Sequence, residues 1–177
     1  MRFARLPPVL LAAALAVAGC GGFPGDLYPS GADRRVPSPS SVGQAAPDFA
    51  LADTAGNPVG LHASLASVRG AVLYFTMWCP ICDAHMSHLQ AHAIPAFPDV
   101  RFFALDYVSG SVAEAHAAQA AAGWEPTAFT VLADVGGAVE GFYQAPMGIV
   151  VVGRDGIIRW NGEYDWSRVQ AVLSALP

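Results

Sequence analysis

The sequence predicts an α/β domain in which a mixed central sheet is covered by helices on both faces. Through the middle of the chain, apolar runs of strand length alternate with segments of helical periodicity, which is typical of parallel strands joined by crossover helices. Two strand-like runs before this alternation predict an N-terminal β-hairpin extension. Two later runs, separated by Gly153-Arg154-Asp155-Gly156, predict a second hairpin that adds an antiparallel edge.

The first elements follow from alternation and turn chemistry. Residues 47–51 alternate apolar and polar side chains, and 59–61 resume after the turn-forming segment 53–58, so a short hairpin is expected. Residues 65–69 predict a short helical or irregular bridge. Residues 71–76 are almost continuously apolar, as expected of a central strand buried on both faces.

The later elements repeat this pattern. Helices are expected at 79–92, where Met86 and Leu89 lie one turn apart, and at 111–122, which Gly123 closes. The other expected elements are strands at 100–105, 129–133, 147–152 and 157–160, a short helix that ends at residue 143, and a terminal helix at 165–176.

The N-terminus has the features of an export signal. Arg2 and Arg5 precede an apolar segment, 6–18, which is too short to span a bilayer and has the length of a signal-peptide core. Small residues then precede Cys20, an arrangement that resembles the bacterial lipobox, whose cysteine is lipidated. We therefore expect a lipoprotein signal peptide at 1–19. The alternative is an ordinary signal peptide with an incidental cysteine.

A tether and one folded domain are expected after the signal. The lipidated Cys20 begins a segment, 20–41, that is rich in Gly, Pro and Ser and predicts a flexible tether. The domain is expected at 42–177. Its lipid would hold it to a bacterial membrane in the cell envelope, with the domain facing the periplasm or another extracytoplasmic space.

Composition sets outer limits on function. The chain has 177 residues and a formal net charge of −5, which fit a single domain and argue against a nucleic-acid partner. Hydrophobic residues make up 54% of the chain, but no apolar run after the signal approaches the roughly 18 residues of a membrane-spanning helix.

Cys79 and Cys82 remain as one pair once Cys20 is assigned to the lipid, because the chain has three cysteines. They form a C-x-x-C motif where an apolar strand meets a helix, and the partial positive charge of a helix N-terminus favours a thiolate on Cys79. A structural disulfide is the alternative, but so short a loop contributes little stabilisation. We therefore expect a redox-active dithiol.

Four ordered features resemble one family. They are Ala46-Pro47-Asp48-Phe49 followed by Gly56-Asn57-Pro58-Val59, the strand that leads into Trp78-Cys79-Pro80-Ile81-Cys82, Ala145-Pro146 directly before the strand at 147–152, and the hairpin at 153–156. Over nearly all of 42–177 the chain resembles the thioredoxin superfamily and, within it, the TlpA/ResA/CcmG-like membrane-anchored thiol–disulfide oxidoreductases of the redoxin or AhpC-TSA type. The resemblance implies a thioredoxin-like fold and disulfide exchange with exported proteins.

The resemblance also implies roles for individual residues. Cys79 would be the attacking thiolate, and Cys82 would be the resolving thiol that breaks the mixed disulfide. Pro146 would be cis and would present backbone groups of Ala145 beside the dithiol to an extended substrate. Trp78 would shield the dithiol face, with plain core packing as the alternative.

His85 is where the chain departs from the family pattern. The ResA- and CcmG-like proteins commonly have a glutamate three residues after the second cysteine, where this chain has His85. A neutral imidazole could accept the Cys82 proton, and an imidazolium would lower the cysteine pKa. The alternative is a solvated surface histidine. The carboxylate that thioredoxins bury in the preceding strand is also absent from residues 71–74.

Two other functions are compatible with parts of the pattern. Thr76 and the first cysteine resemble the peroxide site of peroxiredoxins, although Val72 replaces the expected proline and no arginine has an obvious partner position. The two cysteines with His85 and His88 could instead bind Cu(I) or zinc, as in a Sco-like copper chaperone. Those chaperones, however, have three residues between the cysteines.

Partners follow from the disulfide-exchange hypothesis. We expect protein thiols and disulfides as substrates, contacted in part by Pro80 and Ile81, and an upstream membrane electron donor if the protein is a reductant. No cofactor and no resident metal ion are expected, and the domain is expected to act as a monomer. The sequence contains no signal for the direction of electron flow.

Overall fold

The computed structural model describes residues 40–125 and 127–177. The predicted signal peptide at 1–19, Cys20 and nearly all of the predicted tether lie outside the described residues. Among the residues that are described, no helix combines the length and apolar character needed to cross a bilayer.

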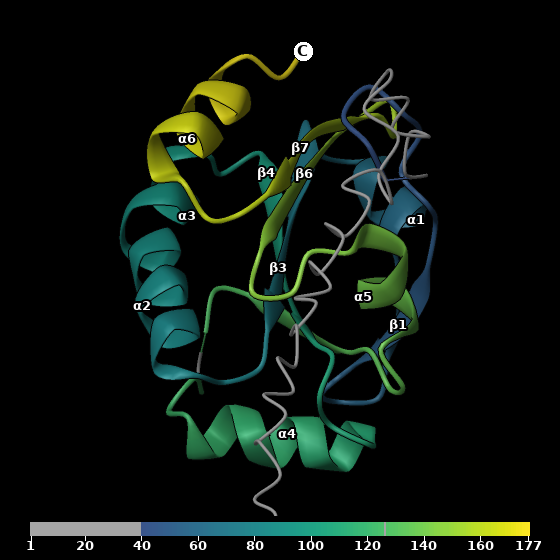
Figure 1. Ribbon diagram of the computed structural model, residues 1–177, viewed down its shortest axis with the longest axis vertical. Helices are drawn as coiled ribbons and strands as arrows, with labels where there is room; N and C mark the ends of the chain where they lie inside the picture. Colours follow the sequence, from purple (N-terminus) through teal and green to yellow (C-terminus); the bar gives the residue numbers. More distant parts are fainter. Residues whose placement is uncertain (1–39, 126) are drawn as a thin grey trace, which may run out of the picture. The chain divides into compact units, whose positions relative to one another are not determined.

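A seven-stranded mixed sheet forms the centre of the domain (Figure 1). Its strands are β1 Ala50–Asp53, β2 Pro58–Gly60, β3 Gly70–Thr76, β4 Val100–Asp106, β5 Thr130–Ala133, β6 Ile149–Gly153 and β7 Ile158–Gly162, in the spatial order β2-β1-β5-β4-β3-β6-β7. The three central strands β3, β4 and β5 are parallel, and the outer pairs are antiparallel. The mixed sheet and both predicted hairpins are therefore confirmed, with the first hairpin at one edge of the sheet.

Helices cover both faces of this sheet, as the sequence predicts. They are α1 Leu61–Leu65, α2 Pro80–His88, α3 Ile94–Ala96, α4 Val112–Ala121, α5 Ala138–Tyr143 and α6 Trp166–Ser174, with a π-helical segment η1, Leu89–Ala93, between α2 and α3. Figure 1 shows α2, α3 and α6 on one side of the sheet and α1 and α5 on the other.

The strand β3 separates two hydrophobic cores. Its side chains alternate between the faces, so that Val72 and Tyr74 pack with α2 and α6, whereas Leu73 and Phe75 pack with α1 and α5. All seven residues of β3 are buried. This burial on both faces explains why the strand is apolar almost throughout, and it fixes the position of the segment that follows.

The long helix after β3 differs from the single helix predicted at 79–92. The described chain continues as a helix through residue 96, but with the π-helical segment η1 in its middle. Pro95 explains the change, because proline has no N–H to donate and its ring crowds the carbonyl four residues earlier. The backbone widens before it, and the N–H of Ile94 bonds to the carbonyl of Leu89, five residues back.

The packed domain includes the last two residues of the predicted tether. Ser40 is buried, and its carbonyl accepts a hydrogen bond of 2.9 Å from Nδ2 of Asn161 on β7. A few residues later, Ala45 forms an isolated antiparallel bridge with Ile157. Packing therefore begins no later than residue 40, because the segment before the first hairpin lies along β7.

We predict that Gly70→Ala destabilises the domain, because a Cβ atom there would lie 2.6 Å from the carbonyl oxygen of Val152 and 2.8 Å from Cδ1 of Leu176. Such overpacking costs about 1–3 kcal/mol, which urea unfolding would measure. Gly141→Ala is the matched control, since its Cβ would meet nothing within 4 Å. It should raise stability by about 0.5–1 kcal/mol because alanine favours a helix. Equal unfolding midpoints would contradict this account of the Gly70 contact.

Candidate active site

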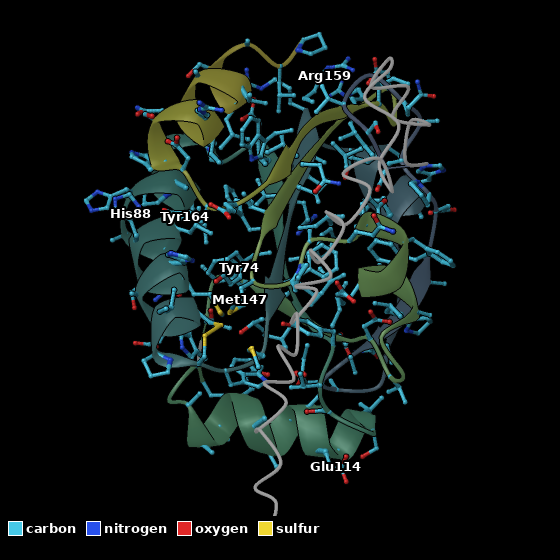
Figure 2. The ribbon with its side chains drawn as sticks, viewed as in Figure 1. Tyr74, His88, Glu114, Met147, Arg159 and Tyr164 are labelled. Atoms are coloured by element: carbon cyan, nitrogen blue, oxygen red, sulfur yellow. A yellow bond between two sulfur atoms is a disulfide. The ribbon has the colours of Figure 1, made fainter. Side chains whose placement is uncertain are left out.

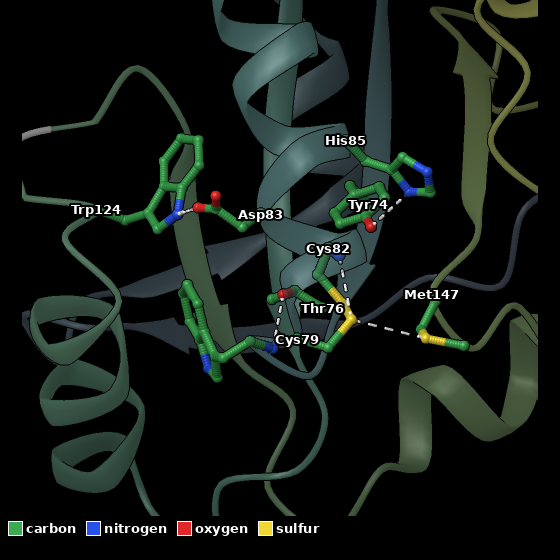
Figure 3. Close-up of a disulfide and its surroundings, with 9 residues drawn as sticks. Tyr74, Thr76, Cys79, Cys82, Asp83, His85, Trp124 and Met147 are labelled. Carbon is green, nitrogen blue, oxygen red and sulfur yellow. Dashed lines mark hydrogen bonds between the residues drawn. A yellow bond between two sulfur atoms is a disulfide. The ribbon is translucent and has the colours of Figure 1, made fainter.

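Cys79 is the N-cap residue of α2. It caps the helix with extended backbone dihedrals, and Pro80 occupies the first helical position, where a missing N–H costs nothing. Its Sγ accepts a hydrogen bond of 3.1 Å from the backbone N–H of Cys82, with which it forms a disulfide (Figure 3). The same N–H would stabilise a Cys79 thiolate in the reduced protein.

The two cysteines differ in their accessibility. Cys82 is completely buried against the core on the α2 side of the sheet, together with Met86 and Leu89. Cys79 is half-buried, so its sulfur is the one that a second molecule can reach. This asymmetry supports the predicted roles of Cys79 as the attacking sulfur and Cys82 as the resolving sulfur.

Trp78 is held in one orientation between β3 and the motif. Its backbone is in the left-handed region, with φ of 57°, and its N–H donates to Oγ1 of Thr76 at 3.1 Å. Its indole Nε1 donates to Oδ2 of Asp106 at 2.8 Å, while the ring packs partly against the hydrophobic core. The indole is thus anchored on both its polar and its apolar sides beside Cys79.

Asp106, which sequence reasoning missed, organises this side of the site. It is fully buried at the end of β4, in register with Thr76 at the end of β3. Besides Trp78, its carboxylate accepts hydrogen bonds from the N–H groups of Val108 and Ser109 and from the Ser109 hydroxyl. A charged residue at the carboxyl end of a buried parallel strand was the available signal, because such strand ends meet at one sheet edge.

Pro146 occupies a β-turn that faces the disulfide. The turn is closed by a hydrogen bond of 2.8 Å from the N–H of Gly148 to the carbonyl of Ala145, which is itself buried. An open cavity of about 270 Å³ adjoins Ala145 and Pro146. The cis geometry of Pro146 and the pairing of Ala145 with a substrate remain predictions.

Met147 is the residue of this turn that reaches the disulfide. Its Sδ lies 3.9 Å from Sγ of Cys79, and the side chain points toward it in Figure 3. The disulfide sulfur has no proton to donate, so the contact is one of van der Waals type. The backbone of Met147 is in the left-handed region, with φ of 55°, an uncommon conformation for a side chain that is not glycine. Sequence reasoning missed it, although its position directly after Pro146 was a signal.

His85 is half-buried and is engaged by two tyrosines. Its Nδ1 lies 3.1 Å from the hydroxyl of Tyr74, and its ring stacks on that of Tyr164 at a centroid distance of 4.3 Å. Burial, followed by the charge of the neighbouring His88, lowers the pKa of His85. Burial also raises the pKa of Tyr74. His85 is therefore neither freely solvated nor placed by a direct hydrogen bond on either cysteine.

His88 extends the same aromatic cluster along the helix. The hydroxyl of Tyr164 lies 2.7 Å from its Nδ1, and the two side chains lie together in Figure 2. Its ring also contacts those of His92 and Trp166. The predicted set of two cysteines with His85 and His88 is thus not assembled, and the described residues contain no group of three or more Cys, His, Asp or Glu placed to bind a metal.

The arginines in the described part of the chain bind groups other than the cysteines. Arg69 pairs with a nearby aspartate, Arg154 donates to the carbonyl of residue 68, and Arg159 and Arg168 pair with aspartates close to them in sequence. Arg101 is in register with Ala71 at the start of β3, opposite the end from which the motif emerges. None of these guanidinium groups is placed to activate Cys79 toward a peroxide.

Exposed apolar side chains lie at the sheet edge from which the cysteine motif emerges. Met77, Ile81, Val108, Val135 and Met147 are all at least 39% exposed. These residues follow the ends of β3, β4 and β5 or precede β6, which runs the opposite way, so the topology brings them to the same sheet edge. We call this surface the apolar rim. Large exposed apolar residues at the same edge as a reactive group are typical of a protein-binding surface.

Comparisons with known proteins agree with this architecture. A model of the AhpC/TSA family matches residues 42–161. A secreted disulfide oxidoreductase of Mycobacterium tuberculosis, described as homologous to E. coli DsbE, is 25% identical, with 72% of this chain and 96% of that chain covered and a TM-score of 0.55. No significant match is found among curated proteins.

Two further solved structures share the fold. Peroxidoxin BcpB of Mycobacterium tuberculosis is 18% identical, covers 76% of this chain and 95% of its own, and gives a TM-score of 0.59. A thioredoxin-like protein of Aeropyrum pernix is 14% identical, covers 72% and 89%, and gives a TM-score of 0.59. Identities this low establish the fold alone, and the predicted thioredoxin-like fold is confirmed.

We predict that the protein loses stability as the pH falls from 7 to 5, and that His85→Gln reduces this loss. The pKa of His85 is lowered in the folded state, so below its ordinary value of 6.5 the unfolded chain binds more protons and unfolding becomes easier. Urea unfolding at both pH values would measure the difference.

His116→Gln is the control, because it removes an exposed histidine on α4 that pairs with Glu125 and not with a tyrosine. A pH-dependent loss that is the same in the wild type and in His85→Gln would show that the burial of His85 has no energetic consequence.

Proposed function

The chain belongs to the AhpC/TSA family, and on that premise we propose that it is an extracytoplasmic thiol–disulfide oxidoreductase acting on exported proteins through Cys79 and Cys82. The observation that carries this proposal is the asymmetric disulfide at the N-terminus of α2, with Cys79 accessible and Cys82 buried behind it. Such a pair can accept or donate two electrons without a cofactor.

The reaction requires two exchanges at sulfur. In the reductive direction, the Cys79 thiolate attacks a substrate disulfide, a mixed disulfide forms, and one substrate sulfur leaves as a thiolate. Cys82 then loses its proton and attacks the sulfur of Cys79, which releases the second substrate thiolate and restores the internal disulfide. Two electrons pass to the substrate. The N–H of Cys82, 3.1 Å from Sγ of Cys79, stabilises the negative charge of the Cys79 thiolate that starts this reaction.

The apolar rim supports a protein substrate. Ile81, 61% exposed, lies two residues after Cys79 on α2, and Met147, 39% exposed, contacts the sulfur of Cys79 from the turn before β6. A protein segment that covers them buries apolar surface while its disulfide reaches Cys79. The secreted neighbour at 25% identity is described as a disulfide oxidoreductase, which supports the same substrate class.

Disulfide exchange is favoured over a peroxidase function. A peroxidase needs a positive group that stabilises the thiolate and polarises the peroxide bond. The described arginines bond elsewhere, whereas the buried second cysteine provides the resolving thiol that exchange requires. Peroxide should therefore be consumed no faster than by a simple dithiol.

The reduction potential of the cysteine pair decides whether the protein donates electrons to its substrates or accepts electrons from them. The equilibrium reduction potential of the cysteine pair, titrated against a thiol buffer and followed by tryptophan fluorescence, is about −270 mV for a thioredoxin-like reductant and about −120 mV for a disulfide-forming oxidant. A reductant would also need an upstream membrane electron donor.

We predict that the Cys79→Ser variant reduces a disulfide-bonded test protein only at the uncatalysed rate, because serine supplies no nucleophilic thiolate. Cys82→Ser should instead accumulate a mixed disulfide with the substrate, visible by mass spectrometry, because the resolving sulfur is missing. Ser87→Ala, an exposed change on α2, is the control and should keep full activity. Full activity in both cysteine variants would exclude the dithiol mechanism.

The proposed anchor gives a second prediction. Cys20→Ser removes the acceptor of the lipid, so the expressed protein should move from the membrane fraction to the soluble extracytoplasmic fraction and should not incorporate labelled palmitate. The substitution Ser40→Ala leaves Cys20 intact and controls for changes near the start of the domain. Labelling of Cys20→Ser equal to that of the wild type would contradict lipidation at this residue.

A further inference from the structure

We propose that the reduced protein binds one Cu(I) ion through the thiolates of Cys79 and Cys82 and the thioether of Met147. This site goes beyond disulfide exchange, because it requires only that the cysteines be reduced. It also differs from the ligand set that the sequence suggests, since His85 and His88 are engaged by Tyr74 and Tyr164.

The spacing of the sulfur atoms supports a trigonal site. Metal–thiolate bonds of about 2.3 Å that meet at 120° place the ligand sulfurs about 4 Å apart. Met147 Sδ and Cys79 Sγ are already 3.9 Å apart. Once the disulfide is broken, the two cysteine sulfurs need to separate to a similar distance, which rotation about the Cα–Cβ bonds of the cysteines can supply while Cys79 stays at the helix cap.

The backbone holds Met147 at this position. The turn from Ala145 to Gly148 is closed by a hydrogen bond, and Met147 stays in the left-handed region with φ of 55°. Gly148 packs tightly behind it, because an added Cβ atom would lie 2.8 Å from the carbonyl of Gly162. A left-handed backbone conformation costs free energy in a residue other than glycine, so it persists only where the surrounding structure enforces it. Here it presents a thioether to the dithiol.

The ligand chemistry selects Cu(I) over harder ions. Two thiolates and a thioether are soft ligands, which suit Cu(I), whereas magnesium and calcium prefer oxygen. Thioether sulfur contributes little to zinc sites, which use cysteine, histidine and carboxylate groups. The charge is also favourable, because two thiolates and one Cu(I) ion give a net charge of −1 at the positive end of α2.

The steps balance in atoms and electrons. A phosphine or dithiol reductant supplies two electrons, the bond between the two sulfurs breaks, and two protons are taken up to give two thiols. Cu(I) then displaces both thiol protons and forms three bonds to sulfur, with no change in its oxidation state. Because the metal occupies both reactive sulfurs, copper binding and disulfide exchange exclude each other.

The test is Cu(I) binding by the reduced domain under nitrogen, after the reductant is removed, in competition with a coloured Cu(I) chelator. The wild type should bind one Cu(I) ion per chain, and X-ray absorption should show three sulfur ligands. Met147→Leu keeps an apolar side chain of similar size but has no ligand atom. Its affinity should fall at least roughly tenfold, since even partners outside the ligand shell affect metal affinity by that factor.

Two further variants test whether Met147 binds the copper ion directly or only affects the site through its shape. Met77→Leu is the matched control, because Met77 is 42% exposed and Met147 is 39% exposed, both on the apolar rim. It should bind Cu(I) as the wild type does. Met147→His supplies a nitrogen ligand in the same place and should recover affinity that Met147→Leu has lost.

Three results would overturn the proposal. They are equal affinities for the wild type and Met147→Leu, two sulfur ligands in the wild type, or one copper ion shared between two chains. Reductase activity should be measured on the same preparations, so that failure of the metal site can be told apart from failure of the proposed disulfide exchange. Loss of copper binding with intact reductase activity would reject only the metal site.

Discussion

The capping of α2 by Cys79 is the constraint on which the rest of the site depends. A helix N-terminus leaves backbone N–H groups without partners, and the sulfur of Cys79 occupies the place of a capping side chain, accepting from the N–H of Cys82. This single contact orients the sulfur and would stabilise its charged form, while the three-residue spacing buries Cys82 beneath it. The chemistry of the motif is therefore a consequence of how a helix begins.

The sheet topology brings the other parts of the site to this helix end. The parallel strands β3 and β4 end in register at Thr76 and Asp106, so a carboxylate buried at one strand end accepts from the indole of Trp78 just past the other. The antiparallel strand β6 starts at the same edge, and the turn before it carries Met147 to the sulfur of Cys79. Parallel and antiparallel neighbours of β3 thus supply opposite sides of the same site.

The face of α2 that lies behind the cysteines has a different character. His85 and His88 are held by tyrosines from β3 and from the segment before α6, so their rings form part of an aromatic layer. Burial lowers the pKa of both histidines, which favours their neutral forms. With both histidines engaged by tyrosines, the sulfur atoms are the available soft ligands at the helix end.

The sequence by itself determined the alternation of strands and helices, both hairpins, and the position of the C-x-x-C motif at a strand–helix junction, because these depend on periodicity and on residues close in the chain. Local rules could also have indicated that Pro95 interrupts a regular helix. Only the tertiary structure decided which groups surround the cysteines. Trp78 and Asp106 are 28 residues apart, and Cys79 and Met147 are 68 residues apart. Their contacts depend on strand order and register, which arise when the whole sheet packs and which no local pattern specifies.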